Sequence, residues 1–199
     1  SNVPRAKNYT KLMKVMVESW RSNWNQNIFP FYYVQIAPYK YNGPENVNSA
    51  LLRESQLNAM NLIENSGMVV TSDLGDLNSI HPSNKIEIGH RLAYWALNKT
   101  YNIKNVVPSG PIVESYNIDE NKVEINFKYA STGFYQFNGP LKDFEIAGND
   151  GVFYKANAKI SGLKIIVESA DVKEPKMLRY GWKNYFESTL FNIDKLPAS

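Results

Sequence analysis

The sequence predicts an α/β fold followed by a region rich in antiparallel β-structure. Over roughly the first hundred residues, helical and strand patterns alternate, which is the order that parallel strands joined by crossover helices produce. After about residue 104 the pattern changes to short segments of alternating polarity separated by turn residues, as in antiparallel sheets. A chain of 199 residues is long enough for two small domains. We place these domains at 1–104 and 105–199.

Three segments space their apolar residues three and four apart, which predicts amphipathic helices. They are 9–25 (Leu12, Met13, Met16, Trp20, Trp24), 48–65 (Leu51, Leu52, Ala59, Leu62, Ile63) and 83–98 (Ile86, Leu92, Ala93, Ala96, Leu97). Gly67 lies where a C-terminal cap of the second helix is expected. Ser83 lies where the N-cap of the third is expected.

Two short apolar runs between these helices, Ile28–Ala37 and Met68–Thr71, predict buried strands. Two strands do not form a stable sheet by themselves, so we expect further strands in polypeptide upstream of Ser1. In the second half, 122–127 and 163–167 alternate in polarity, and turn residues occur at 149–151 and 161–162. This half is expected to form antiparallel sheets in a sandwich-like layer.

Composition excludes several classes of function. The net charge of +3 arises from basic and acidic residues mixed along the chain, so no nucleic-acid partner is expected. No apolar run approaches the ~20 residues that cross a bilayer, so no membrane partner is expected either. There are no cysteines and only two histidines, which excludes disulfides and a cysteine nucleophile and argues against a metal site. The start of the chain holds neither a Met nor a signal peptide, and we expect the natural N-terminus to lie upstream.

The segment 71–90 holds the candidate chemistry. His81 follows the end of a predicted buried strand and precedes a helix, the edge of an α/β sheet where active sites collect. Asp73 and Asp76 lie close enough in sequence to orient its ring. From spacing alone, a surface histidine without a catalytic role is the commoner case. His90 is expected to be structural.

The chain offers no matching nucleophile. It lacks a Gly-x-Ser-x-Gly elbow. Residues 75–78 superficially resemble a Gly-Asp-Ser-Leu block, but their third position is Leu77, which has no hydroxyl. No serine lies on a recognisable strand-turn-helix elbow.

The stretches at 29–39, 52–56, 70–85 and 89–97 resemble the sialate O-acetylesterase-type family of SGNH hydrolases, and those at 144–148, 153–162, 167–175 and 178–184 resemble its C-terminal β-rich part. The resemblance implies a flavodoxin-like (SGNH) α/β/α sheet, present here in part. The family's serine lies in a Gly-Gln-Ser-Asn-type block, which does not occur in this chain. By the same resemblance His81, in an Ile-His-Pro motif, corresponds to the general base.

The acid that would orient His81 is less well defined by the resemblance. SGNH enzymes typically carry Asp three residues before the histidine, where this chain has Asn78, and many relatives carry it two residues before, where this chain has Ser79. Either the histidine works without a close carboxylate or Asp76 or Asp73 approaches it. We favour Asp76.

The implied function is that of the C-terminal portion of a carbohydrate (sialate-type) O-acetylesterase. It needs no metal or organic cofactor, and it acts on an acetylated sugar or glycan in the periplasm or outside the cell. Its expected partner is the missing N-terminal half of the same polypeptide, which carries the serine; a separate chain supplying that half is a further option. The alternative is a non-catalytic carbohydrate-binding or interaction module on a degenerate hydrolase scaffold, since 13% of the residues are aromatic.

Overall fold

A computed structural model describes residues 2–137 and 139–199. The described chain forms two compact units. The first runs to Ser109 and includes Lys183–Tyr185, and the second comprises Gly110–Trp182 and Phe186–Ser199. The mixed α/β composition and the antiparallel sheets predicted from the sequence are confirmed.

The first unit alternates helices and strands as expected. Its elements are η1 (Val3–Arg5), α1 (Ala6–Trp24), β1 (Phe31–Val34), α2 (Asn48–Leu62), β2 (Ser66–Val69), α3 (Lys85–Trp95) and the π-helical turn η2 (Ala96–Thr100). The strands β1 and β2 are parallel, with Phe31 opposite Ser66 and Val34 opposite Val69. The predicted crossover through a helix is therefore confirmed.

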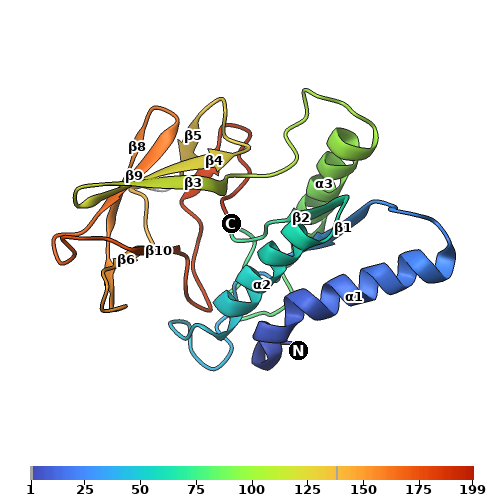
Figure 1. The fold of residues 1–199 in the computed structure, drawn as a ribbon, viewed down its shortest axis with the longest axis horizontal. Helices are drawn as coiled ribbons and strands as arrows, with labels where there is room; N and C mark the ends of the chain where they lie inside the picture. The colour runs from blue at the N-terminus through green and yellow to red at the C-terminus, as the bar shows by residue number, and fades with distance from the viewer. Residues whose placement is uncertain (1, 138) are drawn as a thin grey trace. The chain divides into compact units, whose positions relative to one another are not determined.

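The pair β1–β2 lies between two layers of helices (Figure 1). On one face, α1 and α2 pack against the strands around a buried apolar cluster, which consists of Met13, Val17, Tyr33, Ala59, Ile63, Met68 and Val70. On the other face, the buried Trp95 of α3 donates from Nε1 to the Met68 carbonyl oxygen at 2.9 Å and stacks on Tyr32. Coverage of both faces is the usual condition of parallel strands.

The predicted apolar faces of α1 and α3 are partly wrong. In α1 the buried residues are Ala6, Met13 and Val17, whereas most of the predicted stripe is exposed. In α3 the buried residues are Arg91 and Trp95, and Ile86 is 74% exposed. Periodicity identifies an apolar arc on a helix, but packing decides which part of that arc faces the core.

Both predicted helix caps are wrong. The second helix ends at Leu62, and Gly67 lies within β2 instead of capping it. The N-cap of α3 is Asn84, not Ser83, because the Asn84 side chain accepts a hydrogen bond from the Glu87 amide at 3.2 Å. Asn is as good an N-cap as Ser, so sequence preference could not separate the two neighbours.

Gly67 is required by the packing of Trp95 against β2. A Cβ at position 67 would overlap the indole ring of Trp95, which is fully buried and cannot move aside. We expect Gly67→Ala to lower the free energy of unfolding by about 1–3 kcal/mol, the usual cost of overpacking. The matched control is Gly89→Ala in α3, where nothing lies within 4 Å of the new Cβ and helix propensity should add about 0.5–1 kcal/mol. Urea unfolding of both variants tests this, and equal midpoints would contradict it.

The second unit consists of antiparallel strands. They are β3 (Ile112–Asp119), β4 (Lys122–Lys128), β5 (Phe134–Gln136), β6 (Phe144–Ala147), β7 (Phe153–Lys155), β8 (Asn157–Ser161), β9 (Lys164–Glu168), β10 (Met177–Tyr180) and β11 (Leu190–Asn192). They form sheets ordered β3-β4-β9-β8, β10-β6-β7 and β11-β5. Both alternating segments predicted from the sequence became strands, β4 and β9.

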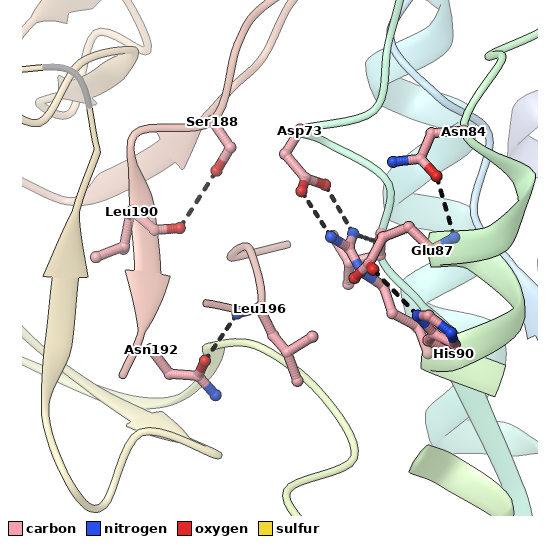
Figure 2. Close-up of polar contacts among 10 residues, drawn as sticks. Asp73, Asn84, Glu87, His90, Ser188, Leu190, Asn192 and Leu196 are labelled. Carbon is pink, nitrogen blue, oxygen red and sulfur yellow. Dashed lines mark hydrogen bonds and ion pairs between the residues drawn. The ribbon is translucent and has the colours of Figure 1, made fainter. Parts of the chain in front are cut away.

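The core of the second unit is built from one face of its four-stranded sheet. Val123, Ile125, Ile165 and Val167 point into a buried cluster that includes Phe144. The opposite face carries the ion pair of Lys164 and Glu124 at 2.8 Å. The end of the chain is held by Asn192, whose Oδ1 accepts from the Leu196 amide at 3.0 Å (Figure 2).

Candidate active-site loop

The loop that follows β2 carries the candidate residues. Because β1 and β2 are parallel, the loops after Val34 and after Val69 leave the sheet at the same edge. The two loops touch: a Cβ on Gly75 would collide with Pro38, and Lys40 Nζ donates to Asn78 Oδ1 at 3.1 Å. The base of the second loop is tied to the sheet by buried Thr71, whose hydroxyl donates to the Gln35 carbonyl oxygen at 2.9 Å.

Asp73 is held by Arg91 of α3. The guanidinium Nη1 donates to Asp73 Oδ1 at 2.7 Å and Nη2 donates to Oδ2 at 2.6 Å. Nη1 also donates to the Val70 carbonyl oxygen at 2.8 Å, and Nε donates to Glu87 Oε1 at 2.9 Å. The Arg91 side chain is only 5% exposed. This bidentate pair fixes the first residues of the loop against α3.

The charge state of Arg91 follows from these contacts. Burial alone would lower the pKa of the guanidinium, but the hydrogen bonds and charge of Asp73, followed by those of Glu87, outweigh burial and raise the pKa above its ordinary value. The other oxygen of Glu87 lies 3.5 Å from Nδ1 of His90 (Figure 2). Asp73, Glu87 and Arg91 therefore form a charged network that positions the loop.

His81 lies on the exposed part of the same loop. Its backbone amide donates to Ser79 Oγ at 3.2 Å, and the same hydroxyl donates to the His81 carbonyl oxygen at 3.2 Å. Within residues 2–137 and 139–199, no carboxylate lies within ion-pair distance of its ring. The ring is exposed and available to a reaction partner.

Asp76 shapes the loop through its backbone. Its Oδ1 accepts hydrogen bonds from the amides of Asn78 at 2.7 Å and Ser79 at 3.1 Å, which closes a turn just before His81. Asp76 is exposed. Of the two acids weighed from the sequence, Asp73 is engaged by Arg91 at both oxygens, and Asp76 is bonded at one. The assignment of Asp76 as the partner of His81 stays a prediction.

Sequence reasoning missed a second buried network, formed where residues 183–185 return to the first unit. Asn184 Oδ1 accepts from the backbone amide and the hydroxyl of Ser49, both at 2.9 Å, and Asn184 Nδ2 donates to the Gly43 carbonyl oxygen at 3.0 Å. Arg53 donates to the Ser49 hydroxyl at 3.1 Å. Burial lowers the pKa of Arg53 to about 10, with Tyr41 acting in the opposite direction. The spacing of polar residues along the sequence could not indicate this contact, because Ser49 and Asn184 are 135 positions apart.

In the described ranges, no group of three or more His, Cys, Asp or Glu side chains is placed to hold a metal ion. No described helix combines the length and apolar character that crossing a membrane requires.

Comparison with known proteins gives a solved relative. No protein-family model and no curated protein matches the chain. Among solved structures, the chain is similar to the crystal structure of a novel carbohydrate acetylesterase from Xanthomonas citri, with 34% identity and a TM-score of 0.89. The match covers 96% of this chain but 45% of that protein. The chain thus spans about half the length of its solved relative, and at this identity the likeness extends beyond the fold to the sequence.

Proposed function

We propose that this chain is the C-terminal portion of a carbohydrate O-acetylesterase of the sialate type, in which it contributes His81 to serine-dependent hydrolysis. The observation that carries the proposal is the likeness of nearly the whole chain to part of a carbohydrate acetylesterase. The nucleophilic serine then belongs to polypeptide outside residues 1–199. We further propose that this polypeptide completes a flavodoxin-like sheet around β1 and β2, and that the protein works in the periplasm or outside the cell.

The proposed reaction has two halves. The serine hydroxyl attacks the acetyl carbonyl carbon while His81 takes the hydroxyl proton, which gives a tetrahedral intermediate. The intermediate collapses to an acetyl-enzyme as His81 returns the proton to the departing sugar alkoxide. Water, deprotonated by the same imidazole, then attacks the acetyl-enzyme and releases acetate and the free serine. Donors around the carbonyl oxygen would stabilise the intermediate.

Two features of the loop support this role for His81. Its ring is exposed at the carboxyl edge of the sheet, and the loop is anchored behind it by Arg91 and Asp73. We propose Asp76 as the acid that orients the ring, because Asp76 is exposed and no cation of the described residues pairs with it. Its engaged Oδ1 keeps the carboxylate in the turn that immediately precedes His81.

Hydrolysis of p-nitrophenyl acetate and of acetylated sugars tests the proposal. The chain alone is expected to be inactive, and the chain joined to the polypeptide encoded immediately upstream of Ser1 is expected to be active. Turnover by the chain alone would refute the argument for an external serine. Lack of hydrolysis by the joined protein with every acetylated sugar would refute the esterase assignment.

A second candidate function is non-catalytic carbohydrate binding. It is favoured by Ser79, which stands where the resemblance places an acid, and by an exposed aromatic pair in the second unit. Tyr135 and Phe137 are 40% and 45% exposed, and their ring centroids lie 6.4 Å apart. Glycan binding by the joined protein without release of acetate would favour this function over the first.

A further inference from the structure

One edge of β1 has no partner strand in the part of the chain that the structure describes. Within residues 2–137 and 139–199, β1 pairs with β2 alone. The amides of Phe31 and Gln35 donate to carbonyl oxygens on the β2 side, at Asn65 (3.0 Å) and Val69 (2.9 Å). Because backbone groups alternate along a strand, Tyr32 and Val34 direct their amides away from β2. An unpaired edge of this kind accepts another strand.

Gln56 of α2 closes the carboxyl end of this edge. Its Oε1 accepts from the Ile36 amide at 2.9 Å, and its Nε2 donates to the Val34 carbonyl oxygen at 3.4 Å. The side-chain amide thus takes the place that a peptide group of a neighbouring strand would occupy. The edge is left open at the Tyr32 amide, the Tyr32 carbonyl and the Val34 amide.

A line of apolar side chains on α1 is also uncovered. Leu12, Met16 and Trp20, spaced four residues apart, are 54%, 37% and 39% exposed; we call them the α1 flank. They lie beside the buried residues of α1, on the side away from Thr10, whose hydroxyl donates to the Ser55 carbonyl oxygen of α2 at 2.8 Å. The flank therefore faces away from α2.

The α1 flank and the open edge are neighbours. Trp20 contacts Phe31 of β1 edge-on, with ring centroids 6.1 Å apart. In Figure 1, α1 lies on the β1 side of α2. A strand added beside β1 would therefore lie beneath the flank. It would pair with the open backbone groups of β1 and cover the exposed apolar side chains of the flank.

We propose that the open edge of β1 and the α1 flank bind a further β-strand, supplied by the polypeptide that carries the nucleophile. This inference rests on the proposed function for the identity of that polypeptide. More than half of the Xanthomonas citri esterase lies outside the 45% that the chain covers, so ample polypeptide exists there to form the strand. A lipid or a glycan would cover the flank but would not pair with the backbone of β1.

Amide hydrogen exchange tests the pairing residue by residue. In the 199-residue chain, Tyr32 and Val34 should exchange fast, whereas Phe31, Gln35 and Ile36 already have acceptors and serve as internal controls. In the chain joined to the polypeptide encoded upstream, Tyr32 and Val34 should slow by about a hundredfold or more. Unchanged exchange at these two amides would overturn the proposal.

A pair of variants tests the flank. Met16→Glu, in the joined protein, places a charge under the added strand, and we expect exchange at Tyr32 and Val34 to accelerate about tenfold to a hundredfold. Val15→Glu is the matched control. Val15 is apolar and 54% exposed, but it lies on the back of the helix, opposite Met13 and Val17, and should change exchange by less than about twofold. Equal effects of the two variants would contradict the assignment of this surface.

These measurements do not depend on hydrolysis. Protected amides in a joined protein that releases no acetate would support the docking surface while refuting the esterase. An active joined protein with unprotected Tyr32 and Val34 amides would support the esterase while refuting the docking surface. A dimer of the 199-residue chain that protects both amides without any upstream polypeptide would assign the surface to a second copy and overturn the proposal.

Discussion

Replacing His81 with alanine is expected to reduce ester hydrolysis by the joined esterase about 100- to 10,000-fold, the range over which a positioned general base accelerates such reactions. The loss should appear in kcat, because the imidazole moves protons in the transition state and need not bind the sugar. Folding should be unaffected, since the side chain is exposed and His81 contacts Ser79 through its backbone. Steady-state kinetics with p-nitrophenyl acetate, together with circular dichroism, measure both.

His90→Ala is the matched control for this variant. His90 is the other histidine of the chain, its side chain is 59% exposed, and it lies beside Glu87 on α3. Its removal should change kcat by less than about twofold, as exposed surface substitutions usually do. A His81→Ala enzyme as active as the His90→Ala enzyme would refute the role of His81 and leave the loop without a catalytic group.

The sequence predicted the elements of the first unit better than it predicted their packing. The parallel pair β1–β2 and the three helices were expected, because apolar periodicity and short apolar runs are local properties. Which side chains are buried is not local. Ile86 was expected in the core and is 74% exposed, and Gly67 was expected as a cap and instead makes room for Trp95.

The same distinction applies to the candidate site. The loop and His81 could be found from their order along the chain, but the partner of Asp73 could not. Arg91 lies eighteen residues away, and only the packing of α3 on the sheet brings its guanidinium to the loop. The return of residues 183–185 to Ser49 and Arg53 was unpredictable for the same reason.

Arg91→Ala is expected to lower the free energy of unfolding of the first unit by about 3–5 kcal/mol, because removing one partner of a buried ion pair leaves the other without its counter-charge. The Arg91 and Asp73 side chains are 5% and 18% exposed, so water replaces the lost hydrogen bonds only in part. The Val70 carbonyl oxygen would also lose a donor. Urea unfolding followed by tryptophan fluorescence measures this, because three of the four tryptophans (Trp20, Trp24 and Trp95) lie in this unit and one (Trp182) lies in the second.

Lys164→Ala provides the matched control, because Lys164 pairs with Glu124 at a similar distance of 2.8 Å but is 46% exposed. An exposed pair of this kind contributes about 0–1 kcal/mol. The double variant Asp73→Ala, Arg91→Ala should be less destabilised than the sum of its two single variants, since either single change already removes the interaction that the two side chains share. An Arg91→Ala variant that loses no more unfolding free energy than Lys164→Ala would contradict this account. The network of Asp73, Glu87 and Arg91 would then not be what holds the His81 loop on α3. The contacts of Thr71 and Gly75 would have to order the loop instead.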